Sequence, residues 1–496
     1  MRSTAQLKTS LTEIIRGSSR GPAAQEITHT YQCDTAEVPA HARRYLRMIE
    51  IFETQFPHAS AVRVFRAPGR VNLIGEHTDY NGYPVLPIAI DRDIAVLVAP
   101  TDGKTIEVRN TDPEYGARRF EISATIEPFD QGDWGNYIKA AVQGLVAEGL
   151  LGYGARGFCA LFDGNIPDSA GLSSSAALVV ASALAALAVN DVLVEPLHLA
   201  EVLAKAERYV GTEGGGMDQA ISLLGRAGSA LKIDFFPLRV EPVPFPQQFA
   251  IVVSNSLVRA AKSAGARDHY NRRVVECRFA AALGAQAAGR RLGRSIGVSL
   301  LSDLAPGNLG LPQQEIDDLI RSEAGETPLS LSDLALKLGT PVSVLKRRYC
   351  RLRGGKFFDE PHDGLKLWQR YRHVVTEAER VDQAQNALKE GSIDNFGQLM
   401  FKSHASCRDD YEVSIPELET LVGLARILHA TGSRLTGAGF GGCTVSLVPK
   451  DYAPEFARQL WLKYAATLPA RGQAEVTPAV FISRPAQGAA ELSFMS

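Results

Sequence analysis

The 496-residue sequence lacks the features of a disulfide-stabilised or metal-clustering protein. Its six cysteines are scattered, and neither a Cys-x-x-Cys pair nor a metal-ligand spacing occurs among them. Free thiols in a reducing compartment fit this pattern better than a disulfide framework. We therefore expect a cytoplasmic protein.

Long hydrophobic runs and an excess of one charge are also missing. The longest mainly apolar run, Ala176–Val189, is too short to span a bilayer, and residues 1–17 contain no apolar core of the signal-peptide type. The formal net charge of −2 provides no general attraction to nucleic acid or to an anionic membrane. We expect neither kind of partner, and we expect the protein to act as a monomer.

The remaining composition is that of an ordinary globular protein, with enough residues for two or three domains. Short alternating segments predict antiparallel strands at 62–100 and 105–120, and amphipathic or Ala/Leu-rich segments predict helices at 41–54, 134–148 and 197–209. This mixture favours an α+β fold over a doubly wound sheet. Residues 1–30 show weak periodicity and many small polar residues, which predicts a poorly ordered N-terminal arm.

The most informative stretch is residues 67–82, which read APGRVNLIGEHTDYNG. It places Arg70, Glu76, His77 and Asp79 among three glycines, with an apolar run on each side. Two carboxylates and an imidazole suit the hydroxyls of one small polyol, whereas a guanidinium suits phosphate or a developing negative charge. The alternative is a solvated loop between strands.

A second glycine-rich stretch, residues 164–178, reads GNIPDSAGLSSSAAL and is followed by strong helix formers. The three serines Ser173, Ser174 and Ser175 are therefore predicted at a helix N-terminus, where free N–H groups and hydroxyls form an anion site. No lysine follows the glycine, so this is not the P-loop motif. Helix capping alone would explain one serine, but three serines behind Gly171 favour phosphate.

Two further glycine-rich stretches carry less information by themselves. Residues 435–448, LTGAGFGGCTVSLV, place four glycines ahead of an alternating, strand-like tail, which a tight hairpin explains almost as well as a ligand loop. Residues 214–219, GGGMDQ, place the carboxylate of Asp218 after three glycines, where backbone can approach a substrate closely. A helix N-cap is the alternative role for Asp218.

Together, the first three stretches resemble the signatures of the galactokinase family within the GHMP kinase superfamily, in the same order along the chain. Segments 163–167, 207–219 and 403–412 resemble the branch that contains N-acetylgalactosamine kinases and fungal galactokinases. The resemblance implies a two-domain GHMP kinase fold with the active site in the cleft between domains. We place the N-terminal domain at 31–240 and the C-terminal domain at 241–496, with a mainly helical insertion at about 277–381 that should be peripheral to the chemistry.

The resemblance also implies an ATP- and Mg²⁺-dependent transfer of the γ-phosphate to the C1 hydroxyl of galactose. Asp218 would be the catalytic base, and Arg70 would stabilise charge beside it. The implied sugar contacts are Arg70, Glu76, His77, Asp79, Asp218 and Tyr270. The implied ATP contacts are Gly171, Ser173, Ser174 and Ser175, and the implied metal ligands are Ser175 and Glu207. Tyr270 could equally be a partly buried helix residue.

Two other functions remain open from the sequence. The same reaction on N-acetylgalactosamine is the nearer alternative, because both sugars share the ring hydroxyls. A non-catalytic galactose and ATP sensor is more remote, since such relatives look damaged in the serine-rich loop and residues 171–177 are intact here. Residues 329–345 and the basic segment 346–356 have the outline of a DNA-binding helix-turn-helix, but neighbouring acidic residues cancel the charge and we expect no DNA binding.

Overall fold

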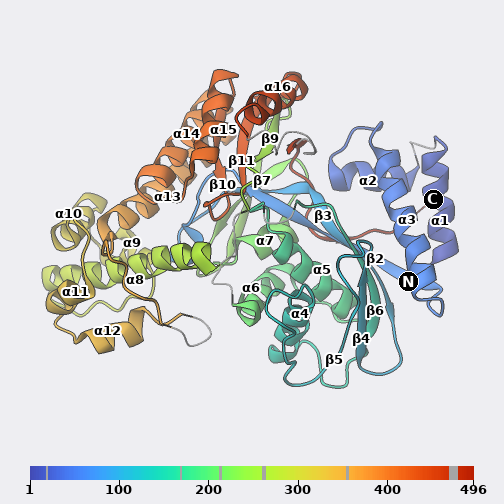
Figure 1. Ribbon diagram of the computed structural model, residues 1–496, viewed down its shortest axis with the longest axis horizontal. Coiled ribbons are helices and arrows are strands. Elements are labelled where there is room, and N and C mark those ends of the chain that lie inside the picture. Colours follow the sequence, from blue (N-terminus) through green and yellow to red (C-terminus); the bar gives the residue numbers. More distant parts are fainter. Residues whose placement is uncertain are drawn as a thin grey trace.

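The computed structural model describes residues 1–17, 21–167, 170–211, 215–259, 264–352, 357–468 and 479–495 and has the predicted α+β fold. A seven-stranded sheet and a four-stranded sheet form the two centres of the molecule, and a helical lobe extends from them (Figure 1). In the described part of the chain, no helix is both long and apolar enough to cross a membrane. All six cysteines are buried as free thiols.

The first sheet carries the stretch at residues 67–82, which we call the sugar-type loop, at the end of one long strand and before the next. Its strand order is β1-β2-β3-β6-β4-β5, with β13 also paired to β2. The strands are β1 Arg2–Ser3, β2 Ala61–Asn72, β3 Pro87–Pro100, β4 Thr105–Asn110, β5 Arg118–Glu121, β6 Phe158–Gly164 and β13 Ala490–Glu491. The pairs β2–β3 and β4–β5 are antiparallel, as predicted, and β4 runs parallel to β6.

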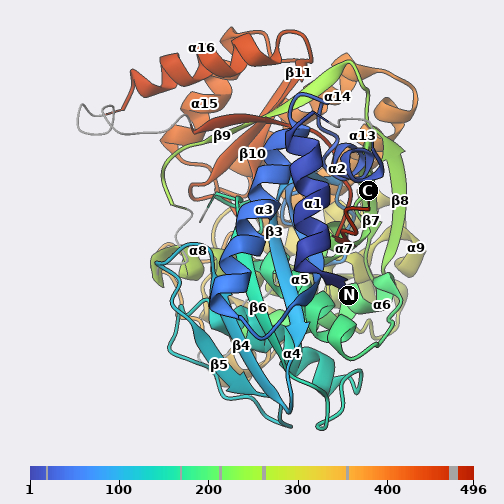
Figure 2. The ribbon, with the colours of Figure 1, turned by 90° about the vertical axis from the view of Figure 1, so that its right-hand side faces the viewer.

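Helices cover both faces of this sheet (Figure 2). One face packs on α5 Ser174–Val189 and α7 Met217–Leu224, and α4 Gly135–Ala147 and α6 Pro196–Ala206 pack against these two helices. The strongly apolar α5 lies in the middle of this core, which explains its lack of a polar face. The short 3₁₀ helix η2 Glu207–Val210 continues α6, and η1 Asp79–Asn81 lies within the sugar-type loop.

The opposite face corrects the prediction of a poorly ordered arm at residues 1–30. Apart from residues 18–20, which lie outside the described residues, this segment forms α1 Thr4–Ile15 and α2 Pro22–Tyr31, which pack with α3 Val38–Gln55. Leu7, Leu11 and Ile27 are fully buried against the sheet. The sparse apolar residues fall on one face of each helix, and this short-range pattern was too weak to recognise without the partner surface.

The second sheet has the order β10-β11-β9-β12, and all of its pairs are antiparallel. Its strands are β9 Phe249–Asn255, β10 Gly432–Thr436, β11 Cys443–Pro449 and β12 Val480–Ser483, and a separate hairpin joins β7 Ser229–Asp234 to β8 Arg239–Pro244. Around it lie α13 Leu367–Lys389, α14 Ile393–Asp409, α15 Pro416–Ile427 and α16 Ala453–Ala465. After β12 the chain returns to the first sheet, where β13 pairs with β2. The predicted C-terminal domain of 241–496 therefore ends in a segment that belongs to the first sheet.

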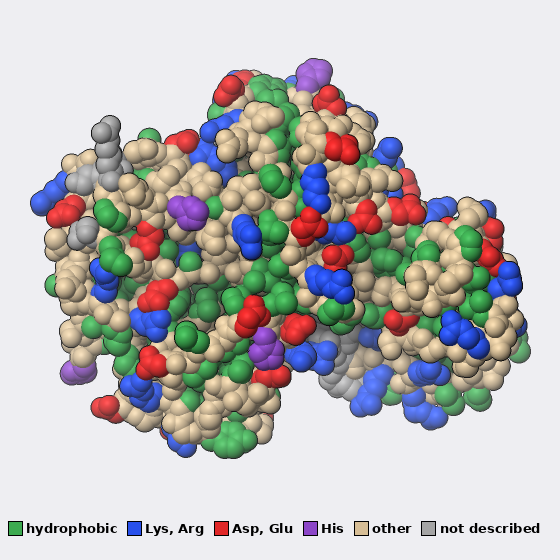
Figure 3. Space-filling view, turned by 180° about the vertical axis from the view of Figure 1, so that it is seen from behind, with side chains coloured by type: hydrophobic (Ala, Val, Ile, Leu, Met, Phe, Trp, Pro, Cys, Tyr) green, Lys and Arg blue, Asp and Glu red, His purple; other side chains and the backbone are tan. Residues whose placement is uncertain are grey.

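The helical lobe contains most of the region predicted as an insertion, 277–381, whose last residues belong to α13. Its elements are α8 Ala264–Leu292, η3 Leu301–Leu304, α9 Pro306–Leu309, α10 Gln313–Ala324, α11 Leu331–Leu338 and α12 Val342–Tyr349. The helix–glycine turn–helix outline of 329–345 is present as α11, Gly339 and α12. Basic side chains gather over the end of α12, at the lower right of Figure 3, although residues 353–356 of the basic segment lie outside the described residues. Elsewhere on the lobe, arginines are paired with acids, as in Arg290–Glu323 and Arg291–Glu315.

Candidate active site

One large cleft gathers every site residue that the sequence predicted. It has a volume of about 1010 Å³ and lies between the first sheet, the N-terminus of α5, α7 and the loop between β10 and β11. The predicted residues that line it are Arg70, Glu76, His77, Asp79, Gly171, Ser173, Ser174, Ser175, Glu207, Asp218 and Tyr270. Their individual roles stay predictions, but residues up to 200 positions apart in the chain are brought to one place.

The carboxylate of Glu76 joins the sugar-type loop to the second sheet. Arg434 on β10 donates from Nη1 to Oε2 of Glu76 at 2.8 Å, and the N–H of Gly437 donates to Oε1 at 3.1 Å. Both side chains are almost completely buried. Burial raises the pKa of Glu76 even though Arg434 and Arg70 favour its charged form. Glu76 therefore ties two motifs together whether or not it also touches a sugar.

A second buried carboxylate, Glu377 on α13, holds the backbone of the same loop. Its Oε1 accepts the N–H of Gly75 at 2.9 Å and the N–H of Glu76 at 3.3 Å. The hydroxyl of Ser403 donates to the same oxygen, and Arg380 donates from Nε to Oε2 at 2.7 Å. Burial by itself would raise the pKa of Glu377, but the charges of Arg380 and Arg434 hold it well below its usual range.

His77 lies at the centre of an aromatic cluster in the cleft. Its Nδ1 lies 3.0 Å from the hydroxyl of Tyr80, which lies 2.7 Å from the hydroxyl of Tyr411, and its Nε2 lies 3.2 Å from the carbonyl oxygen of Ala438. Burial lowers the pKa of His77 to about 3, so the ring is neutral at neutral pH. The ring of Tyr270 packs 5.8 Å from that of His77, which favours its predicted place in the cleft.

Arg70 connects the predicted base to the serine-rich loop. Its Nε donates to Oδ1 of Asp218 at 2.7 Å, and its Nη1 donates to the carbonyl oxygen of Gly171. Asp218 is in the first turn of α7, so the positive end of that helix also faces its carboxylate. The guanidinium thus lies at the junction of the predicted sugar and phosphate subsites, where a phosphoryl group would be transferred.

Asp79 sits beside this pair and is held by backbone. The N–H of Gly215 donates to its Oδ2 at 3.0 Å, and a Cβ on Gly215 would come within 2.6 Å of that oxygen, so only glycine allows this approach. Burial, and then the charge of Asp218, raises the pKa of Asp79 to about 6. Donors from a ligand would relieve this destabilised charge.

The serine-rich loop has the geometry of an anion site. Ser174 and Ser175 are the first residues of α5, and Ser173 precedes them in the left-handed conformation with φ of 60°. Among the described residues, the buried hydroxyl oxygen of Ser173 has no hydrogen-bond partner. Gly437 packs so closely on this loop that a Cβ would lie 2.7 Å from the carbonyl oxygen of Gly171. Free N–H groups, an unpartnered hydroxyl and the positive helix end together suit a phosphate.

Metal ligands are few in this cleft. The described residues contain no cluster of three or more His, Cys, Asp or Glu side chains that could hold a metal ion. Glu207, Ser175 and Asp218 line the cleft from three different elements, η2, α5 and α7. A donor set of this size fits a cation that keeps several waters and binds mainly through a phosphorylated substrate.

Sequence reasoning missed the residues that hold the sugar-type loop. Glu377 and His373, whose Nε2 lies 3.0 Å from the carbonyl oxygen of Glu76, lie on α13 within the predicted insertion of 277–381. The end of that region is therefore not peripheral, which corrects the prediction. Arg434 comes just before the third glycine-rich stretch. Its one signal in the sequence is a charged residue placed directly beside that stretch. For Glu377 the sequence contains none.

Comparisons with known proteins bear on the family of this chain. Family models match the galactokinase galactose-binding signature at residues 50–100, the GHMP kinase N-terminal domain at 136–226 and the GHMP kinase C-terminal domain at 384–466. Similar curated proteins include a galactokinase of Dictyostelium discoideum, 35% identical over 88% of this chain and 91% of its own length. A galactokinase of Saccharomyces cerevisiae is 34% identical over 86% and 90%, respectively.

A solved structure is similar as well. The crystal structure of Lactococcus lactis galactokinase complexed with galactose is 28% identical, covers 89% of this chain and 98% of its own, and superposes with a TM-score of 0.70. The predicted family is confirmed by these relatives, and the predicted GHMP kinase fold with it. The chain belongs to the galactokinase family of GHMP kinases.

Proposed function

We propose that this protein transfers the γ-phosphate of ATP to the C1 hydroxyl of galactose and releases galactose 1-phosphate and ADP. It is a sugar kinase by family, and its relatives carry the name galactokinase. The observation that carries the proposal is the Arg70–Asp218 pair at 2.7 Å, in which Arg70 belongs to the sugar-type loop and also contacts the serine-rich loop through Gly171. Phosphoryl transfer depends on positioning and charge stabilisation, and this pair is placed for both.

In this mechanism Asp218 accepts a hydrogen bond from the C1 hydroxyl and takes its proton as the oxygen attacks phosphorus. Arg70 keeps the carboxylate of Asp218 in place and offers its remaining positive charge to the transferred phosphoryl group. Asp79 and His77 contact ring hydroxyls of the sugar. Glu76 contacts them as well while it stays bound to Arg434, and Tyr270 on α8 contacts the sugar from the opposite side. The loop of Gly171, Ser173 and Ser174 holds the phosphates of ATP.

The residues present fit Mg²⁺ bound through the nucleotide. Ser175 and Glu207 would hold the ion. The serine-rich loop contains no lysine, so the ion would supply the positive charge that offsets the triphosphate. The unpartnered hydroxyl of Ser173 supports a phosphate at the same loop. We also propose that the protein acts in the cytoplasm, as the scattered thiols predicted, and that it is a monomer.

Galactose is favoured over N-acetylgalactosamine because the similar proteins are galactokinases and one of the structures holds galactose. The non-catalytic sensor is disfavoured because Arg70, Asp218 and Ser173–Ser175 are all present in the cleft.

Initial rates of ADP release with galactose, N-acetylgalactosamine, glucose and arabinose test the proposal. We expect galactose to have the highest kcat/KM, with the phosphate on C1 by ³¹P NMR. A higher kcat/KM for N-acetylgalactosamine would replace the proposed substrate, and no ADP release with any sugar would support the sensor.

A further inference from the structure

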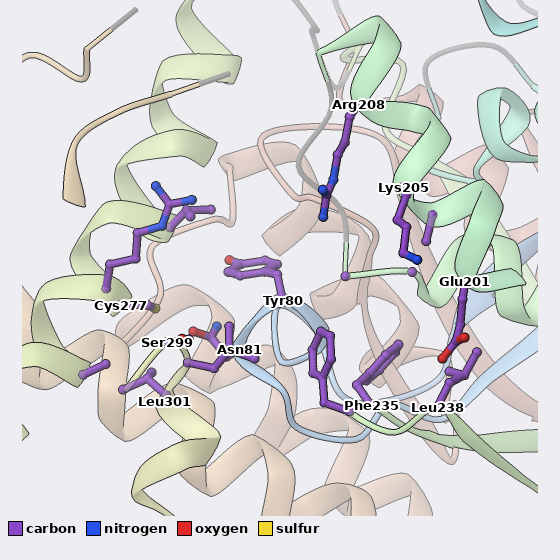
Figure 4. A pocket seen from close by; sticks show the side chains of 18 of the residues that line it. Tyr80, Asn81, Glu201, Lys205, Arg208, Phe235, Leu238, Cys277, Ser299 and Leu301 are labelled. Atoms are coloured by element: carbon purple, nitrogen blue, oxygen red, sulfur yellow. The ribbon is translucent and has the colours of Figure 1, made fainter. Parts of the chain in front are cut away.

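A second cavity, of about 470 Å³, adjoins the active-site cleft, and Tyr80 and Gly216 line both. One wall comes from α6, η2 and the turn between β7 and β8, and the other comes from α8 and the segment around Leu301 (Figure 4). We call this space the side cavity. Its volume lies in the range of small-molecule sites, and it separates the first domain from the helical lobe.

Two positively charged side chains line the side cavity. Lys205 and Arg208 lie three residues apart at the end of α6 and in η2, and Figure 4 shows both side chains extending into the cavity, Arg208 on the side of Tyr80. Within the part of the chain that the structure describes, neither forms an ion pair or a side-chain hydrogen bond. An ammonium and a guanidinium group with unused donors in one cavity are suited to a phosphate.

Much of the remaining cavity wall is apolar and aromatic, and Arg278, which donates to the carbonyl oxygens of Tyr349 and Arg351, also lines it. Phe235, Leu238, Val274 and Ala281 are buried side chains that face it. Phe236 is 67% exposed at its edge and has a φ of 58°, a costly conformation for a bulky side chain. An exposed aromatic ring at the edge of the cavity can stack against the ring of a ligand.

A few polar groups complete the lining. The side chains of Asn81, Glu201 and Ser299 lie among the apolar residues, and Figure 4 shows Glu201 on the same helix as Lys205. A carboxylate and an amide at this position can accept or donate hydrogen bonds to ligand hydroxyls. Glu201 also disfavours a ligand that is an anion throughout.

We propose that the side cavity binds a phosphate monoester of a small hydroxylated ring compound. The phosphate lies against Lys205 and Arg208, and the ring lies against Phe235 and Tyr80. A sugar phosphate and a nucleoside monophosphate share this chemistry, and the experiment below distinguishes them.

The lining of the side cavity also supports the sugar site, so the two ligands should be coupled. The hydroxyl of Tyr80 lies 3.0 Å from Nδ1 of His77, and Nδ2 of Asn81 donates to the carbonyl oxygen of His77 at 2.9 Å. The N–H of Gly215, which also lines the cavity, donates to Asp79. A ligand that contacts Tyr80, Asn81 and Gly215 therefore changes the affinity for galactose more than that for ATP.

Isothermal titration of the full chain tests the site directly. Saturating galactose and Mg²⁺–ADP occupy the active-site cleft, and galactose 1-phosphate and AMP are then titrated in separate arms. We expect saturable 1:1 binding in at least one arm, and the arm that binds identifies the source. The double variant Lys205→Ala/Arg208→Ala should bind at least tenfold more weakly.

The matched control is Lys402→Ala/Lys463→Ala, which removes two exposed positive charges from α14 and α16. It should bind as the wild type does, with unchanged basal turnover. Absence of binding in both arms, or equal affinity of the two double variants, overturns the proposed site. In rate assays, the binding compound should shift the KM for galactose in the wild type and not in Lys205→Ala/Arg208→Ala; a KM that does not move contradicts the coupling.

Discussion

Replacing Glu377 by Gln should loosen the sugar-type loop, and it leaves every side chain that we place on the substrate unchanged. The carboxylate accepts two N–H groups of the loop, and its other oxygen faces Arg380. Glutamine has nearly the same shape, and its one carbonyl oxygen can still accept from Gly75. Its amide group, however, cannot accept from Arg380 and cannot balance the nearby charge of Arg434.

The size of the effect follows from the buried charges. Removing one member of a buried ion pair costs roughly 3–5 kcal/mol, and we expect the lower end because Arg434 keeps its 2.8 Å contact with Glu76. The unfolding free energy should therefore fall by about 3 kcal/mol. If half of this loss falls on the loop, the KM for galactose rises roughly tenfold, since 1.4 kcal/mol is a factor of ten, while kcat changes little.

The assay pH follows from the sign of the pKa shift. The folded pKa of Glu377 is depressed, so its stabilising contribution is present above the unfolded value of about 4.3 and is lost as the pH falls through the folded pKa. Urea unfolding and galactose kinetics at neutral pH therefore measure the full effect. Glu379→Gln is the control, because Glu379 is exposed on the same helix. Equal urea midpoints and KM values for the two variants would refute the reasoning.

Three further results are expected. Ser175→Ala should raise the Mg²⁺ requirement and the KM for ATP more than the KM for galactose; free-metal titration checks this, and an unchanged Mg²⁺ dependence would return Ser175 to helix capping. Galactose affinity should fall as the pH drops through about 6, because protonation of Asp79, whose pKa burial raises to about 6, removes a charged acceptor; Asp79→Asn should abolish this acidic limb in KM profiles. The helical lobe should not bind DNA, because paired acids offset much of its basic charge; salt-sensitive, sub-micromolar binding in anisotropy titrations, lost when Arg347, Arg348 and Arg351 become Ala, would contradict this.

The sequence predicted the chemistry of the cleft better than its support. Arg70, Asp79 and Ser175 belong to short stretches that combine glycines with several polar side chains. Such a combination is seldom needed for folding alone, so the local pattern was sufficient to indicate a ligand site. Glu377 acts through a contact with Gly75 that spans 302 positions in the chain. No local pattern distinguishes such a glutamate from the exposed Glu379 two residues later.

The same difference explains the errors in the fold. The alternating tail of residues 435–448 forms the strand Cys443–Pro449, as its pattern predicted. The helices of residues 4–31 pack on a sheet face whose strands lie later in the sequence. The C-terminal strand β13 pairs with β2, which is more than 400 residues earlier in the chain. Tertiary contacts decide these elements, and propensity does not report them.

The central claim is that Asp218, held by Arg70, takes the proton of the C1 hydroxyl. Single-turnover rates of Asp218→Asn with galactose and Mg²⁺–ATP test it most directly, alongside nucleotide affinity measured by titration. Because an amide cannot accept the proton, the account predicts a loss of roughly 10²–10⁴-fold in the rate of phosphoryl transfer with nearly unchanged ATP binding. Retention of more than about a tenth of the wild-type rate would contradict it, since general-base losses are far larger than that.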